Sequence, residues 1–259
     1  MRADFDTYST QYPNVAMTRT SNGVVELRLH TDGGPLVWGD LPHSTLGDCF
    51  ADVGGDPDNR VVVITGTGDE FIARLDRSWA TDVGMTPALW DRIYTHGRRL
   101  LQSLLDIEVP VIAAVNGRAT VHAELAVLAD IVLASDDTVF ADAPHFRFGT
   151  VPGDGVHAVW PLLLGANRGR YFLLTGQRIA AKEALDLGVV GEVLPRDTLL
   201  PRAHELAQQL AKQPTTTLRY TRAALTHTLK ALLHDTVPYG LALEGLGAHA
   251  SWPTGKGKD

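Results

Sequence analysis

The amino-acid sequence predicts an α/β core followed by a helical C-terminal region. Two observations support this fold class. Short apolar runs typical of strands alternate with segments of helical periodicity in the first part of the chain, and only helical periodicity continues after residue 167. No Pro- or Ser-rich linker separates the two parts. With 259 residues, of which 44% are hydrophobic and 20% charged, the chain is long enough for one large domain with a substantial core.

Strands and loops are predicted to alternate in the first third of the chain. Residues 24–29 place Val25, Leu27 and Leu29 on one face of a strand, because successive side chains of a strand point to opposite faces. Residues 60–65 form a continuous apolar run, which is typical of a strand buried on both faces, and a Gly-Thr-Gly turn follows it.

A long helix is predicted to begin with Thr86 as its N-cap and Pro87 at the first helical position. Its apolar residues recur at spacings of three and four until Pro110 follows its end. The alternation then continues with a buried strand at 111–115, a helix from 122 to 129, strands at 131–134 and 139–140, and a loop over 143–153. An apolar stretch at 156–164 leads into the C-terminal helical segments.

Composition and charge argue against several functional classes. The net charge of −7 and the lack of clustered Lys and Arg disfavour nucleic acid as a partner. No apolar run reaches the ~20 residues of a membrane span, and the first residues lack the apolar region of a signal peptide. The single cysteine, Cys49, excludes an internal disulfide and a cysteine-based zinc site, and the histidines show no HxH or HExxH spacing. A cytoplasmic protein without a bound metal is expected.

Residues 107–117 (IEVPVIAAVNG) are similar to the crotonase, or enoyl-CoA hydratase/isomerase, superfamily. Three further segments fit the same family in the same order: 62–66, 129–134, and 174–176 together with 184–190. The resemblance implies a spiral core of repeated ββα turns over residues 1–195 and a helical region over 196–259 that is used in trimer assembly. A homotrimer or a dimer of trimers is therefore expected.

Two turns depart from the CoA-dependent members of this family. Those members place small residues, usually glycines, at the turns whose backbone N–H groups bind the thioester oxygen. Here Arg74 occupies the position of a glycine in the first turn, and the glycine triplet is missing from the second turn at 116–125. The sequence therefore argues against a standard thioester oxyanion hole.

Four other segments resemble one branch of the superfamily, 6-oxocamphor hydrolase and related β-diketone hydrolases. They are residues 121–124 (VHAE), 144–146 (PHF), 151–155 (VPGDG) and 168–177 (RGRYFLLTGQ). Enzymes of this branch cleave a C–C bond of a cyclic 1,3-diketone by a retro-Claisen reaction without CoA. The resemblance implies a small apolar cyclic diketone as the substrate and no cofactor. It places the catalytic residues at His122, His145, Asp154 and Glu244, with Trp38 contacting the substrate.

Hydrolysis of a β-diketone requires an activated water, an enolate stabilised by the second carbonyl, and a proton for the enolate carbon. Imidazole suits the activation of water because its ordinary pKa lies close to working pH. We expect His145 to be the general base and Asp154 to orient it, because a loop containing Gly and Pro joins the two residues. Two other interpretations of Asp154 remain open: an N-cap of the helix that follows Gly155, and an ion pair with His157.

The remaining candidates also have ordinary structural alternatives. His122 is expected to stabilise the enolate oxygen and Trp38 to donate its indole N–H to a substrate carbonyl, although each residue taken alone would be interpreted as structural. Glu244 lies among leucines, where a carboxylate is either exposed or orients water or substrate in the site. Trp79 is expected to shape the pocket.

The other charged residues near these motifs are not assigned a catalytic role. Glu124 and Asp76 are interpreted as structural, while Arg74 and Arg147 either contact a polar substrate group or are exposed. The sequence thus predicts a cofactor-independent C–C hydrolase that converts a cyclic or bicyclic β-diketone to a keto acid. The alternatives are a CoA-thioester hydratase or isomerase of the same fold and a non-catalytic paralogue.

Overall fold

The computed structural model describes residues 4–78 and 85–251, and its main sheet has six strands. Their order is β1 (Val15–Arg19), β2 (Val24–Leu29), β4 (Val61–Thr65), β7 (Val111–Val115), β9 (Ile131–Ser135) and β12 (Glu192–Leu194). The β1–β2 pair is antiparallel and the other neighbours are parallel. The predicted α/β fold with a helical C-terminal region is confirmed, and the structure shows that its main sheet is mostly parallel.

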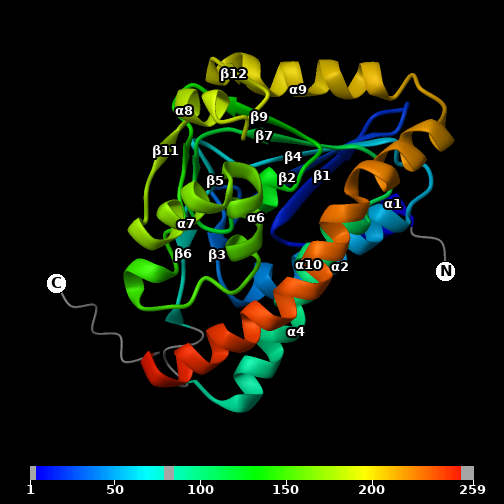
Figure 1. Ribbon diagram of the computed structural model, residues 1–259. Coiled ribbons are helices and arrows are strands. Elements are labelled where there is room, and N and C mark those ends of the chain that lie inside the picture. Colours follow the sequence, from blue (N-terminus) through cyan, green and yellow to red (C-terminus); the bar gives the residue numbers. More distant parts are fainter. Residues whose placement is uncertain (1–3, 79–84, 252–259) are drawn as a thin grey trace.

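Both faces of the central strands are covered. On β4, Val62 and Ile64 belong to the larger core, whereas Val61 and Val63 pack with helix α9 (Arg196–Leu210) on the opposite face. Figure 1 shows α9 lying across β4, β7 and β9. This two-sided burial explains the continuous apolar run in the sequence and confirms the strand predicted at 60–65.

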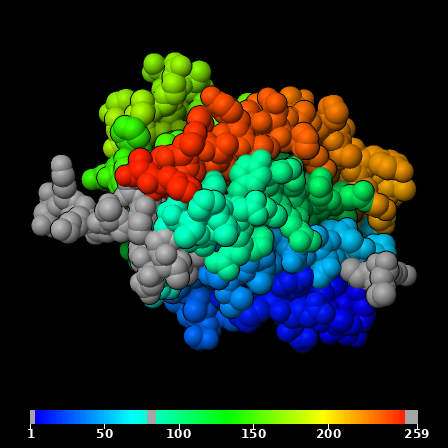
Figure 2. All heavy atoms as spheres, turned by 90° about the horizontal axis from the view of Figure 1, so that it is seen from below, coloured from blue at the N-terminus to red at the C-terminus, as the bar shows by residue number. Residues whose placement is uncertain are grey.

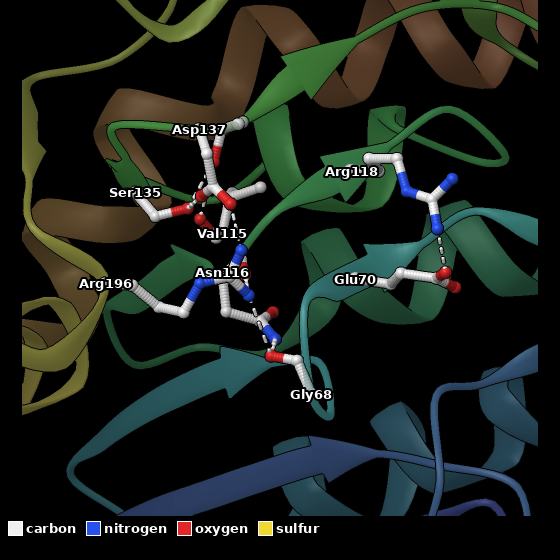
Figure 3. Close-up of polar contacts among 9 residues, drawn as sticks. Gly68, Glu70, Val115, Asn116, Arg118, Ser135, Asp137 and Arg196 are labelled. Atoms are coloured by element: carbon white, nitrogen blue, oxygen red, sulfur yellow. Dashed lines mark hydrogen bonds and ion pairs between the residues drawn. The ribbon is translucent and has the colours of Figure 1, made fainter.

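A second layer of short strands follows the ends of the main strands. The order is β11 (Ile179–Ala180), β10 (Val139–Phe140), β8 (Arg118–Ala119) and β5 (Glu70–Ile72), and β3 (Val37–Trp38) pairs separately with β6 (Arg74–Leu75). Polar side chains fix the turns between the two layers (Figure 3): Asn116 Nδ2 donates to the Gly68 carbonyl at 3.0 Å, and Arg196 reaches both the Asn116 carbonyl and Asp137. These turns carry the chain toward the pocket described below.

Helix α2 (Asp40–Gly55) corrects the expectation that the first third contains only strands and loops. Its buried residues do recur at helical spacing: Pro42, His43, Leu46, Gly47, Cys49, Phe50 and Val53. The pattern is obscured in the sequence by a proline in the first turn and by glycines, which have low helix propensity. A Cβ on Gly47 would lie 3.2 Å from the Leu100 amide nitrogen, which is tighter than an ordinary contact, so glycine favours the close approach of α2 to α4 (Pro87–Asp106).

Helix α4 (Pro87–Asp106) begins where it was predicted to begin. The Thr86 hydroxyl accepts a hydrogen bond from the Leu89 amide at 3.1 Å, and Pro87 occupies the first turn. The predicted helix at 122–129 is shorter in the structure, where α5 spans only Glu124–Val127.

The remaining helices are α1 (Phe5–Tyr8), η1 (Phe146–Phe148), α6 (Val156–Leu164), α7 (Ala166–Thr175), α8 (Ala181–Asp186) and α10 (Thr215–Ser251). The C-terminal segments after residue 214 form one continuous helix with Pro238 inside it. In Figure 2 the C-terminal half of α10 lies along α4, and α10 also packs against α6. Among the described residues, no helix combines the length and apolarity required to cross a membrane.

Candidate active site

A cavity of about 80 Å³ lies between the short strands β3 and β6 and the helices α2, α4 and α10. Its lining residues are Trp38, His43, Leu75, Asp76, Arg77, Ile93, His122, Pro144, His145, Thr150, Asp154, Leu241 and Glu244. Five of the six residues predicted for the site are therefore brought together, from positions 38 to 244 of the sequence. The sixth, Trp79, lies outside the described residues.

Local backbone geometry presents these side chains to the cavity. Trp38 ends β3, and His122 follows β8 in a left-handed conformation with φ of 46°, which is uncommon for a residue other than glycine. The 151–155 loop is pressed against α10: a Cβ on Gly153 would lie 2.2 Å from the Gly240 carbonyl oxygen. This glycine contact places Asp154 beside the helix that carries Glu244.

His145 is buried and held by a carboxylate that the sequence interpretation did not identify. Asp142 Oδ1 lies 2.6 Å from His145 Nδ1, while Asp154 Oδ2 is 3.4 Å and Glu244 Oε1 is 3.8 Å from His145 Nε2. The side chain that orients the ring through Nδ1 is thus Asp142, and Asp154 faces the nitrogen on the cavity side. The only clue in the sequence was its spacing of three residues from His145.

His122 has a similar arrangement. Glu124 Oε1 lies 2.6 Å from His122 Nδ1, and the Trp38 ring stacks on the imidazole with centroids 3.9 Å apart and planes inclined by 35°. Glu124, which the sequence analysis interpreted as structural, is fully buried and is the direct hydrogen-bond partner of His122. Because Glu124 occupies Nδ1, Nε2 is the nitrogen left to meet a substrate.

Asp154 lies between the two histidines. Its Oδ2 is 3.4 Å from His145 Nε2 and 3.5 Å from His122 Nδ1, and its Oδ1 has no hydrogen-bond partner among the described residues. The two alternative interpretations are not supported: α6 begins after Gly155 without a side-chain cap, and His157 Nε2 instead lies 3.2 Å from the Thr236 carbonyl oxygen.

These contacts set the charges in the cavity. Burial by itself lowers the pKa of His145, but Asp154 and Asp142 overcome this effect and raise that pKa well above 6.5. Burial also lowers the pKa of His122, but Glu124 and Asp154 raise it by more, so the pKa of His122 is raised overall. Burial raises the pKa of Asp154, but the neighbouring histidines lower it by a larger amount. The carboxylate of Asp154 is therefore ionised.

Glu244 behaves differently from the other acids of the site. Burial raises the pKa of Glu244 to about 8, with His145 opposing the shift and Asp154 adding to it. Its Oε2 has no hydrogen-bond partner among the described residues. A mostly protonated carboxyl facing the cavity can both donate and accept hydrogen bonds, which suits the positioning of water.

One atom each of His122, Glu124 and Asp154 could in principle bind a metal ion, because these atoms lie within 4.8 Å of one another. It is the one such group of His, Cys, Asp or Glu residues in the described parts of the chain. The 2.6 Å contact shows that Nδ1 of His122 is already engaged by Glu124. The geometry is therefore that of a hydrogen-bonded cluster.

Two residues of the wall, His43 and Arg77, were not predicted individually. His43 is buried edge-on to Trp38, and burial, followed by the nearby His122 and His96, lowers its pKa to about 3, so it is neutral. Arg77 lines the cavity, whereas Arg74 and Arg147 do not. Arg74 instead pairs with the buried carboxylate of Glu70, which also binds Arg118 (Figure 3).

The backbone amides of the two family turns are partly engaged within the protein. The Asp76 amide donates to the Trp38 carbonyl at 2.8 Å, and the Val121 amide donates to the Ile72 carbonyl at 3.1 Å. These two N–H groups are therefore already paired and do not point freely at a ligand.

Comparisons with known proteins agree with this architecture. The model of the enoyl-CoA hydratase/isomerase family matches residues 43–241. The carnitinyl-CoA dehydratase of Citrobacter koseri is 34% identical over 211 residues, which cover 81% of this chain and 78% of that protein.

Two solved structures are informative. A beta-diketone hydrolase from the cyanobacterium Anabaena sp., bound to (S)-3-oxocyclohexyl acetic acid, is 51% identical, with a TM-score of 0.92 over 94% of this chain and 97% of that one. An enoyl-CoA hydratase/isomerase from Mycobacterium paratuberculosis is 26% identical, with a TM-score of 0.84 over 92% and 94% of the two chains.

The resemblance inferred from the sequence is confirmed at two levels. The family model spans most of the chain, and a beta-diketone hydrolase shares its fold at 51% identity. The chain belongs to the enoyl-CoA hydratase/isomerase family.

Proposed function

We propose that this protein is a cofactor-independent hydrolase that cleaves a C–C bond of a cyclic or bicyclic β-diketone and releases a keto acid. One observation carries the proposal: His145, which is buried, and His122, whose side chain is 12% exposed, each have a carboxylate 2.6 Å from Nδ1 and face one small cavity on either side of Asp154. This arrangement supplies a base for water and a cationic donor for an enolate oxygen, which are the two groups that the reaction needs.

The first step is the activation of water by His145. Its Nε2 lies 3.8 Å from Glu244 Oε1, and one water about 2.8 Å from each atom can hydrogen-bond to both. His145 takes a proton from this water as the oxygen attacks one carbonyl carbon of the substrate. Asp142 keeps Nδ1 protonated and stabilises the imidazolium that forms.

The second step is cleavage of the bond between the attacked carbon and the carbon that separates the two carbonyls. The bonding electrons move to the second carbonyl and give an enolate, while the attacked carbon becomes a carboxylic acid. His122 and the adjacent Trp38 are proposed to hold the enolate oxygen, because Glu124 and Asp154 favour the protonated form of His122.

The third step returns a proton to the enolate carbon. The proton taken from water by His145 restores the charge balance when it is delivered to that carbon, so diketone and water give one keto acid with no other reactant. Asp154, within 3.5 Å of both histidines, stabilises the imidazolium wherever it forms.

The 51% identical hydrolase supports the product class. The molecule bound to that protein, 3-oxocyclohexyl acetic acid, is the keto acid that hydrolysis of bicyclo[2.2.2]octane-2,6-dione yields. A homotrimer or a dimer of trimers in the cytoplasm belongs to the same proposal. Light scattering on the purified protein tests the oligomeric state.

A CoA-thioester dehydratase or hydratase is the second candidate, because the carnitinyl-CoA dehydratase of Citrobacter koseri covers 81% of this chain. The arginine at position 74 and the missing glycine triplet at 116–125 speak against thioester binding at these turns. A non-catalytic paralogue has no such support, because the cavity retains all four predicted catalytic side chains.

The two candidates are separated by incubating the purified protein with bicyclo[2.2.2]octane-2,6-dione and, separately, with carnitinyl-CoA. Our proposal predicts conversion of the diketone to keto acid without CoA, and loss of this conversion in His145→Ala. Turnover of the thioester without turnover of any cyclic diketone would support the second candidate instead.

A further inference from the structure

The wall of the cavity contains one arginine, Arg77, that takes no part in the three proposed steps of the reaction. Arg77 is half-buried and is the only Lys or Arg among the described residues that line the cavity. Its Nη2 donates to the Pro144 carbonyl at 3.1 Å, and its guanidinium carbon lies 4.9 Å from the centroid of the Phe148 ring. A carbonyl and an aromatic face therefore hold the guanidinium in place.

Neither contact neutralises the positive charge of Arg77. Within residues 4–78 and 85–251, no carboxylate lies at ion-pair distance from its guanidinium, whereas Arg74, three residues earlier, pairs with Glu70. Burial lowers the pKa of Arg77. Of its five N–H donors, one is used by Pro144, so donors remain for a planar acceptor such as a carboxylate.

The proposed reaction produces such an acceptor inside the cavity. The diketone is uncharged, but the keto acid carries a new carboxylate at the carbon attacked by water. This charge appears close to the ionised Asp154, which repels it. Arg77 rests on Pro144, the residue directly before His145, and so lies against the backbone that presents the proposed base.

We propose that Arg77 forms a carboxylate subsite that binds the acid group of the keto acid as the C–C bond breaks. This inference rests on the proposed function for the origin of the carboxylate. It implies that keto acids bind more tightly than uncharged molecules of the same shape, and that they inhibit turnover.

The test is calorimetric titration of the full-length protein with (3-oxocyclohexyl)acetate and with its uncharged methyl ester. The variants are R77Q, R77K and, as a matched control, R74Q, which removes an arginine of the same segment that does not line the cavity. Circular dichroism and the melting temperature show that each variant is folded.

In the wild type, the acid is expected to bind more tightly than the ester. R77Q weakens binding of the acid by about 10-fold or more, the range of a charge-assisted hydrogen bond, while the ester changes by less than about 2-fold. R77K keeps part of the preference for the acid, and R74Q keeps all of it. An R77Q variant that retains the wild-type ratio between acid and ester, or an equal loss in R74Q, would overturn the subsite.

Turnover of bicyclo[2.2.2]octane-2,6-dione identifies the source of the carboxylate and separates the two proposals. With a product subsite, R77Q raises the inhibition constant of the acid but leaves the KM of this neutral diketone nearly unchanged. A KM that rises as much as the inhibition constant overturns the assignment to the product. If the wild type discriminates acid from ester through Arg77 but hydrolyses no diketone, the proposed function fails while the carboxylate subsite stands.

Discussion

Replacing Asp142 by asparagine tests how the site holds its general base. Asp142 Oδ1 lies 2.6 Å from His145 Nδ1, and its side chain is 3% exposed. Asparagine keeps the shape of the side chain but removes a charge that, together with Asp154, raises the pKa of His145. The variant therefore yields a less basic imidazole that is also less firmly oriented.

The expected magnitude follows from the contact that is lost. A hydrogen bond to a charged group contributes about 1.5–3 kcal/mol, and each 1.36 kcal/mol of barrier is about tenfold in rate, so D142N should lower kcat/KM for a diketone roughly 10- to 150-fold. Because His145 must be unprotonated to accept a proton, the limb of the pH–rate profile that reports the pKa of His145 should also move to lower pH. A purely structural role of Asp142 would not move this limb.

Asp56 offers a matched control for this experiment. Its side chain is likewise 3% exposed and hydrogen-bonded, to Tyr8 and to Arg19, but it does not line the cavity. D56N should lower stability without shifting the pH–rate profile. The reasoning would be refuted if D142N kept the wild-type rate and profile, or if D56N shifted the profile equally.

Three other predictions follow from the same structure. In the wild type, kcat/KM should follow a bell-shaped pH profile, because turnover needs His145 unprotonated and His122 protonated, and both limbs should lie above 6.5 because both pKa values are raised; a limb centred below 6.5 contradicts the assigned roles. The pKa of Glu244 is raised from 4.5 to about 8, so its contribution to stability is complete below 4.5 and is lost by the time pH has risen through 8. The melting temperature should therefore fall more steeply between pH 4.5 and 8 in the wild type than in E244Q, and equal slopes would contradict this. Thr86→Ala removes the N-cap of α4 and should lower the free energy of unfolding by about 1 kcal/mol in a urea titration; an unchanged midpoint would refute the cap.

Elements with a local signal could be predicted from the sequence. The strand at 60–65 is buried on both faces, so its side chains are uniformly apolar, and the cap of α4 consists of two adjacent residues whose preferences agree. Only the family resemblance could place the four catalytic candidates together, because they are up to 122 residues apart in the chain. These candidates are His122, His145, Asp154 and Glu244.

Elements that depend on tertiary packing could not be predicted. Helix α2 contains Gly47 where it passes close to α4, and the burial of this helix outweighs the low helix propensity of Pro42 and Gly47. Asp142 reaches His145 Nδ1 only because the chain turns back between β10 and η1, and no periodicity in the sequence reports such a turn. Asp142, and not the predicted Asp154, is therefore the carboxylate that orients His145 through Nδ1, whereas Asp154 lies 3.4 Å from Nε2.

The central claim is that water, activated at His145, is added across a C–C bond. The most direct test is hydrolysis of bicyclo[2.2.2]octane-2,6-dione in ¹⁸O-labelled water without CoA or added metal, followed by mass spectrometry of the acid. The account predicts one labelled oxygen in the new carboxylate with the wild type and no product with His145→Ala. Undiminished turnover by His145→Ala, or a wild type that leaves cyclic diketones intact while converting an acyl-CoA, would contradict it.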